Sequence, residues 1–149
     1  MTQIDNGRTP PAFALFELGF RPFFSAAGLF AVITMLLWML MYVFSEQLPL
    51  SSIYQASWHA HEMIYGYAMA AVAGFLLTAV SNWTGIPGTR GSALASLFAL
   101  WLVARVAWFI PGEFSVPLAA TADGLFMLGL IVSVSLPVIR VRQWTQLGI

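Results

Sequence analysis

The chain alternates between four long apolar stretches and short loops rich in turn-forming residues. The apolar stretches cover about residues 23–44, 58–80, 93–110 and 117–138. Each is close to the roughly 20 residues that an α-helix needs to cross the hydrocarbon core of a bilayer. The loops are too short to form another domain, so residues 1–149 are expected to form a single membrane domain. The pattern predicts an all-α, polytopic bundle of four transmembrane helices.

The composition narrows the chemistry that such a bundle can carry. Hydrophobic residues make up 60% of the chain and charged residues 8%, which leaves too little polar surface for a soluble domain. The chain has no cysteine, which excludes disulfides, thiolate metal sites, iron–sulfur clusters and covalently attached c-type haem. No basic patch or run of charge suggests nucleic acid as a partner. The expected partner is the lipid bilayer.

The distribution of arginine predicts the orientation of the bundle. Arginines precede the first span, lie in the loop after the second span and follow the fourth span (Arg8, Arg21, Arg90, Arg140 and Arg142). The other two loops contain no basic residue and carry Glu46 and Glu113 instead. Because basic residues concentrate on the cytoplasmic side of membrane proteins, both termini are predicted to be cytoplasmic. The second span then begins at the outer face.

Three of the predicted spans each carry one ionisable residue in the outer half of the membrane: Glu62, Arg105 and Asp123. An ionised side chain at the centre of a spanning helix costs about 2.5–3.5 kcal/mol on insertion scales, so such residues normally face a partner or a cavity. We therefore predict an intramembrane polar network in which Arg105 contacts Glu62 or Asp123, although Arg105 alone could instead reach the outer headgroups. Two acids against one base leave an unbalanced charge, which a cation, a protonated carboxyl group or a protonated histidine would settle.

The two histidines of the chain, His59 and His61, lie at the outer start of the second span, in the segment WHAHEM. An imidazole in hydrocarbon needs a partner, and neutral imidazole is the commonest metal ligand in proteins. The cluster therefore points to metal, haem or proton chemistry. The alternative is that both are amphipathic residues in the headgroup region.

Helical geometry separates the two histidines. In a regular helix His59 shares a face with Glu62 and with a row of small residues (Gly66, Ala70 and Gly74). Such a row predicts a close seam between helices, which would point His59 and Glu62 into the bundle. His61 lies roughly 200° away around the helix, on the face of Tyr65. The two histidines can bind one ion only if the helix begins after His59; otherwise they serve different sites.

The tryptophans near the ends of the spans have a simpler interpretation. Tryptophan is enriched where membrane and water meet. We therefore expect an interfacial aromatic belt made of Trp58, Trp83, Trp101 and Trp108.

Segments of the first three spans together resemble one family. They are LGFRPFF at residues 18–24, WHAHEM at 58–63, GFLLTAVSNWTG at 74–85 and LWLVAR at 100–105. This combination resembles the NnrS family, multi-pass proteins of the bacterial inner membrane that contain haem and copper and are associated with the response to nitric oxide and nitrosative stress. The matching positions are Arg21, His59, His61, Glu62, Asn82 and Arg105.

The resemblance implies haem b and copper as cofactors and nitric oxide as a ligand, and it assigns a ligand role only to His59 and His61. It also implies about a dozen transmembrane helices. We therefore expect this chain to be the N-terminal third of such a protein, with the remaining helices as partners and with a metal site that is incomplete in the isolated chain. No catalytic residue is assigned. Two alternatives remain: a component of an ion or small-solute transporter that uses Glu62, Arg105 and Asp123, or a truncated fragment without activity of its own.

Overall fold

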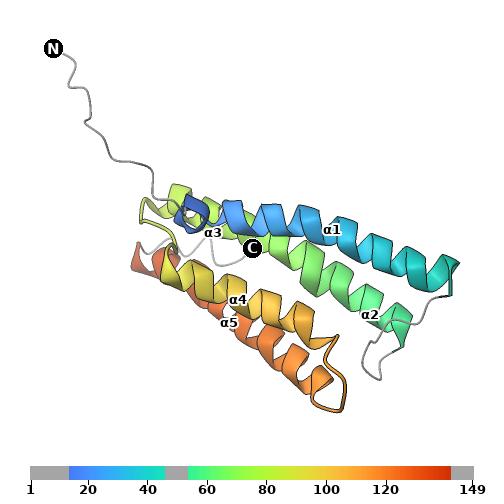
Figure 1. Cartoon of the computed structure of the whole chain (residues 1–149). Coiled ribbons are helices and arrows are strands. Elements are labelled where there is room, and N and C mark those ends of the chain that lie inside the picture. The colour runs from blue at the N-terminus through green and yellow to red at the C-terminus, as the bar shows by residue number, and fades with distance from the viewer. Residues whose placement is uncertain (1–13, 46–53, 142–149) are drawn as a thin grey trace.

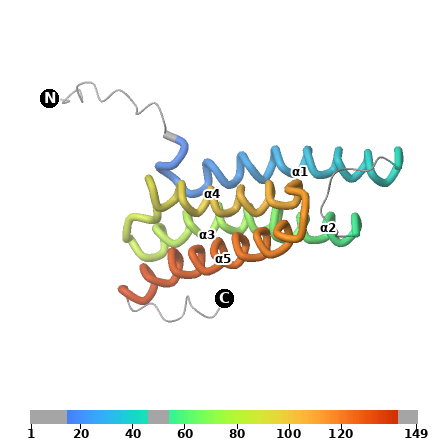
Figure 2. The backbone as a smooth tube through the Cα atoms, turned by 60° about the horizontal axis from the view of Figure 1, so that its bottom comes forward, coloured from blue at the N-terminus to red at the C-terminus, as the bar shows by residue number. Residues whose placement is uncertain are grey.

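The computed structural model describes residues 14–45 and 54–141, and all regular elements in these residues are helices (Figures 1 and 2). A short 3-10 turn, η1 (Ala14–Glu17), precedes the long helix α1 (Phe20–Val43). The next helix is continuous over Gln55–Thr84. It consists of α2 (Gln55–His61), the π-helical segment η2 (Glu62–Ala68) and α3 (Met69–Thr84). Helices α4 (Ser92–Ala107) and α5 (Ser115–Arg140) complete the bundle.

Three of these helices are long and apolar enough to cross a membrane: Phe20–Val43, Gln55–Thr84 and Ser115–Arg140. Helix α4 is also apolar, but its 16 residues extend only about 24 Å at 1.5 Å per residue, short of the roughly 30 Å hydrocarbon core. The sequence predicted this span to reach residue 110, whereas the chain leaves the helix after Ala107 and turns. The all-helical fold is confirmed, with three helices long and apolar enough to span a membrane, and α4 as a fourth crossing stays a prediction.

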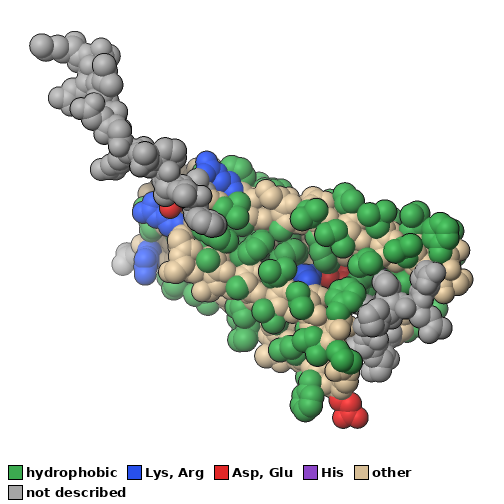
Figure 3. All heavy atoms as spheres, viewed as in Figure 1, with side chains coloured by type: hydrophobic (Ala, Val, Ile, Leu, Met, Phe, Trp, Pro, Cys, Tyr) green, Lys and Arg blue, Asp and Glu red, His purple; other side chains and the backbone are tan. Residues whose placement is uncertain are grey.

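Successive helices run in opposite directions, so each end of the bundle gathers the ends of four helices (Figure 1). We call one end the arginine end, because Arg21 at the start of α1, Arg90 before α4 and Arg140 at the end of α5 lie there. Figure 3 shows basic side chains gathered at this end. The opposite end, where α2 begins, is called the histidine end. Arg8, Glu46 and Arg142, which entered the prediction of orientation, lie outside the described residues.

Local signals in the sequence explain where the helices begin and end. Pro22 lies in the first turn of α1, where proline is tolerated because the first N–H groups of a helix have no partner within it. Helix α3 ends at Gly85, whose φ of 67° is left-handed. Its N–H donates to the carbonyl of Ser81 at 2.9 Å, a common way to satisfy the last carbonyls of a helix.

Small residues bring α1 and α3 into close contact. Ala70 and Gly74 of α3 are buried, and a Cβ atom added to Gly74 would lie 3.1 Å from Cδ2 of Phe24. The seam predicted from the spacing of small residues is therefore present, with α1 as the partner helix. Helix α3 also contacts α5, which packs along α4.

The core has two parts with different composition. The larger apolar cluster lies between α1, α3, α4 and α5 and includes Phe23, Leu77, Leu94 and Phe126. A second cluster, at the histidine end, includes Trp58 and Trp108. The expected aromatic belt is wrong for three of its members, because Trp58, Trp101 and Trp108 are 1%, 2% and 3% exposed. Their large apolar rings fill the core between the helices instead of lining the membrane surface.

We predict that Gly19→Ala loosens the contact between α1 and α3. An added Cβ would lie 2.5 Å from Cβ of Leu77, an atom that cannot move without its backbone, so the helices would have to separate. Overpacking of this kind costs about 1–3 kcal/mol. The matched control is Gly28→Ala in α1, where nothing lies within 4 Å of the added atom. In detergent, the midpoint of thermal unfolding should fall only for Gly19→Ala; equal midpoints would contradict the close contact.

Candidate functional site

Three charged side chains are buried in the described part of the bundle, and each comes from a different helix. Glu62 begins η2, Arg105 lies in the last turn of α4, and Asp123 lies in the first half of α5. Their exposed fractions are 1%, 4% and 5%. Because Arg105 is almost fully buried, its side chain does not reach toward the outer headgroups, which was the alternative prediction for this residue.

The guanidinium group of Arg105 joins the two acids. Its Nη2 donates to both carboxylate oxygens of Asp123, at 2.5 and 2.6 Å. Its Nη1 lies 3.5 Å from Oε1 of Glu62. Arg105 therefore contacts both Glu62 and Asp123, the two acids predicted as its partners because they lie at the same depth. Such contacts are required because a buried charge without a partner is costly.

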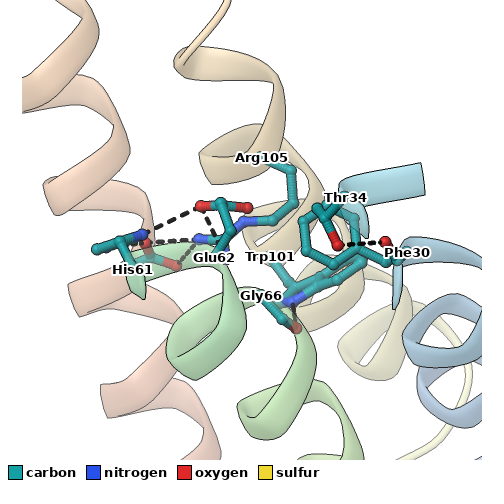
Figure 4. Close-up of polar contacts among 8 residues, drawn as sticks. Phe30, Thr34, His61, Glu62, Gly66, Trp101 and Arg105 are labelled. Atoms are coloured by element: carbon teal, nitrogen blue, oxygen red, sulfur yellow. Dashed lines mark hydrogen bonds and ion pairs between the residues drawn. The ribbon is translucent and has the colours of Figure 1, made fainter. Parts of the chain in front are cut away.

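The imidazole of His61 contacts the same two acids from the other side (Figure 4). Its Nδ1 lies 3.1 Å from Oε1 of Glu62, and its Nε2 lies 3.5 Å from Oδ2 of Asp123. Two basic and two acidic side chains thus alternate around a closed ring, which we call the four-residue ring: His61, Glu62, Arg105 and Asp123. A protonated His61 would bring the charge of this ring to zero.

His61, and not His59, faces the two acids. The sequence predicted His59 inside the bundle with Glu62 and His61 on another face, and the structure corrects this. Trp58 is buried in the row that continues through Glu62 and Gly66, whereas His59 faces α1. A π-helix carries more residues in each turn than an α-helix. From Glu62 onward, residues four apart therefore stay on one line, whereas both histidines lie in the regular helix α2, before the π-helical segment.

Gly66 makes room for the guanidinium group. A Cβ atom at this position would lie 2.9 Å from Nη1 of Arg105 and would also collide with the ring of Phe30. The carbonyl oxygen of Gly66 accepts a hydrogen bond of 3.0 Å from the indole N–H of Trp101 (Figure 4). The Trp101 ring also lies beneath Arg105, with Cζ 5.9 Å from the ring centroid, a favourable arrangement for a cation. Trp101 and Gly66 thus pack against one side of the four-residue ring.

His59 has a separate environment. Its ring stacks on Trp38 of α1, with the centroids 4.4 Å apart and the planes 13° from parallel. Its Nδ1 is buried and has no hydrogen-bond partner. His61 stacks on Tyr65, with centroids 4.7 Å apart, which agrees with the face that the sequence predicted for this pair. Because α2 begins at Gln55, before both histidines, they serve different surroundings.

Comparison with known families identifies the chain. The family model described as NnrS protein matches residues 14–149. The chain belongs to the NnrS family. Comparison with curated proteins and with solved structures gives no match.

The positions that resemble NnrS proteins fall into two groups in the structure. His59, His61, Glu62 and Arg105 lie at or near the histidine end. Arg21, in the first turn of α1, and Asn82, in the last turn of α3, lie at the arginine end. The structure therefore does not bring Arg21 or Asn82 to the four-residue ring.

Metal ligands are not clustered in the described residues. Within residues 14–45 and 54–141, no group of three or more His, Asp or Glu side chains is arranged to hold a metal ion. Both nitrogens of His61 face carboxylates. Of the two predicted ligands, His59 is the one whose buried nitrogen has no partner.

Aromatic side chains complete the site and were not predicted to do so. Trp38 supports His59, Trp101 supports Arg105, and Trp108 packs edge-on against His61 with centroids 5.0 Å apart. The helical spacing of Trp101 and Arg105 in α4, and of Trp108 directly after it, places all three on one side. This spacing, together with the buried charge of Arg105, was the sequence signal from which these aromatic contacts could have been predicted.

We predict that Asp123→Asn destabilises the protein by about 3–5 kcal/mol, because Arg105 then stays buried without its nearest carboxylate. The double variant Asp123→Asn, Arg105→Gln should recover part of this loss, since it removes the buried charge together with its partner. Glu113→Gln, in the exposed turn before α5, is the control and should leave the stability unchanged. Unfolding in bicelles would measure all three. A single variant no less stable than the control would show that the ion pair contributes nothing.

Proposed function

We propose that this chain acts in the bacterial inner membrane in the response to nitric oxide, and that its functional region is the histidine end. Membership of the NnrS family supports the membrane setting and the association with nitric oxide. Buried charged residues are concentrated at one level of an otherwise apolar bundle, and this supports placing the functional site there. Charged residues inside a membrane are costly and usually mark functional positions.

The proposed orientation places the arginine end in the cytoplasm and the histidine end outside. Arg21, Arg90 and Arg140 support it, since arginine and lysine concentrate on the cytoplasmic side. Glu113, in the turn between α4 and α5, belongs to the other end. Both termini would then be cytoplasmic, and α4 would be the fourth crossing.

Reporter fusions test this topology, including the crossing by α4. A fusion after Gly88 should report a cytoplasmic position and a fusion after Glu113 a periplasmic one. Green fluorescent protein and alkaline phosphatase, joined at each position in turn, give opposite signals on the two sides. Identical signals at both positions would show that α4 does not cross the membrane. Exchanged signals would reverse the orientation.

The two histidines differ in how well they fit a haem or copper ion. His61 does not fit as a ligand, because each of its ring nitrogens faces a carboxylate within 3.5 Å. His59 fits, because stacking on Trp38 fixes its ring and its buried Nδ1 lacks a partner. We therefore propose His59 as the residue that would hold the metal. A haem iron or copper ion there would supply the centre that coordinates nitric oxide.

The chain's own residues would fix the imidazole ring of His59 and keep the charges of the four-residue ring away from it. The stack on Trp38 limits rotation of the His59 ring, which lowers the entropy lost when a ligand binds. Each carboxylate of the four-residue ring already faces Arg105 and His61, so the ring balances its own charge when His61 is protonated. One free imidazole is fewer ligands than a copper site requires. Further His, Asp or Glu ligands would have to come from outside the described residues.

The alternative of a transporter component gains no support from the described residues. A polar pathway should continue through the bundle, but the core cluster that extends toward the arginine end is apolar, with Phe23, Leu77 and Leu94 in its interior. The buried polar residues of the described part are Thr34, Glu62, Arg105, Ser115 and Asp123. None of these lies near the start of α1 or the end of α3.

We predict that His59→Ala lowers the haem and copper content of the membrane-purified protein, whereas His61→Gln leaves more of it in place. The reason is that only His59 has a ring nitrogen free to bind. The Soret absorbance and elemental analysis give the two contents, and the yield of monodisperse protein shows that each variant inserts. The 149-residue chain alone should hold less than one equivalent of haem. Loss of metal on changing His61 but not His59 would contradict the assignment.

A further inference from the structure

A groove on the outside of the bundle at the arginine end has the features of a lipid site. Two hollows, of about 410 and 310 Å³, adjoin along the exposed rings of Phe20 and Phe24 and share both of them as walls. We call them together the Phe24 groove. The first hollow is also lined by Arg21 and Ser25. The second continues onto α3, past Gly74 and Phe75 to Asn82.

The floor and walls of the groove are apolar along the length of the helices. Phe24 and Phe75 are 46% and 56% exposed, and they line the groove from α1 and α3. The absence of a side chain at Gly74 lets the Phe24 ring lie close against α3, since a Cβ there would be only 3.1 Å from that ring. Thr78 donates its hydroxyl to the carbonyl of Gly74 at 2.9 Å. No unpaired hydroxyl of Thr78 therefore opposes a hydrocarbon chain.

The mouth of the groove is polar and lies at the arginine end. Arg21, in the first turn of α1, lines the first hollow, and Asn82, in the last turn of α3, lines the second. Among the described residues at this end, Arg21, Arg90 and Arg140 outnumber the acid Glu17, and Figure 3 shows basic side chains gathered here. A basic mouth above an apolar groove between helices is typical of sites for anionic lipid headgroups.

We propose that the Phe24 groove binds one anionic phospholipid. Its phosphate lies at Arg21 and Asn82, and one acyl chain lies along Phe24 and Phe75. The charge at the arginine end favours an anionic over a zwitterionic headgroup. The apolar walls favour a lipid over a free phosphate, which would gain nothing from the aromatic rings. This gives Arg21 and Asn82 a role at the end of the bundle opposite the four-residue ring.

Native mass spectrometry of the full chain tests the proposal. The detergent-purified protein is mixed with equal amounts of phosphatidylglycerol and phosphatidylcholine, and the retained lipid is counted. We expect one phosphatidylglycerol to be preferred. Arg21→Gln should lower this preference about five-fold, the effect of one basic residue near an anionic lipid surface. Arg140→Gln, at the same end but outside the groove, is the matched control and should keep the preference.

Further experiments distinguish a bound lipid from other molecules that could occupy the Phe24 groove. Phe75→Ala, at an exposed position that leaves the core intact, should weaken retention of both lipids alike, because it removes contact with the acyl chain. An excess of inorganic phosphate should not displace the bound lipid. Three results would overturn the proposal: equal loss of preference in Arg21→Gln and Arg140→Gln, displacement by phosphate, or no change on Phe75→Ala. A second copy of the chain bound in place of lipid would also overturn it.

Discussion

The ion pair between Arg105 and Asp123, with Glu62 beside it, is the constraint on which the bundle depends. Each of these charges is buried among apolar helices, where water cannot solvate it, so each must find its counter-charge inside the protein. The three residues come from α4, α5 and η2. A rotation or shift of any one helix would separate a charge from its partner. The network therefore fixes the register of the helices more strictly than apolar side chains could, since these can repack.

The π-helical segment keeps one row of residues directed into the bundle. In an α-helix, residues four apart drift by roughly 40° at each step, so Trp58 would point roughly 120° away from Ala70. In the structure Trp58, Glu62, Gly66 and Ala70 are all buried. The wider turns of η2 remove the drift and keep Glu62 directed at Arg105 while Ala70 stays against α1. Gly66 occupies the point where the row passes the guanidinium group, and only a residue without a side chain leaves space there.

The sequence was sufficient for features that depend on hydropathy and charge. The predicted spans match α1, the helix over Gln55–Thr84 and α5 to within a few residues, and the shared depth of Glu62, Arg105 and Asp123 led to their contact. Features that depend on helix geometry were missed. The sequence predicted His59 beside the acids, but His61 faces them, because the contacts of each ring depend on which neighbouring helices pack against it. Tryptophans near span ends were assigned to the interface, because their sequence position does not show whether a neighbouring helix covers them.

The separation of the two histidines follows from the same geometry. His59 and His61 are two positions apart on a helix, so their side chains point to nearly opposite sides. His61 contacts the acids and so connects to α4 and α5, while His59 packs on α1. His61 and Arg105 both face Glu62 and Asp123, which closes the ring without any ion. His59 has no such partners at its buried nitrogen. A ligand set built around His59 would therefore use the α1 side of the bundle, where apolar and aromatic surface is exposed, and not the acids of the four-residue ring.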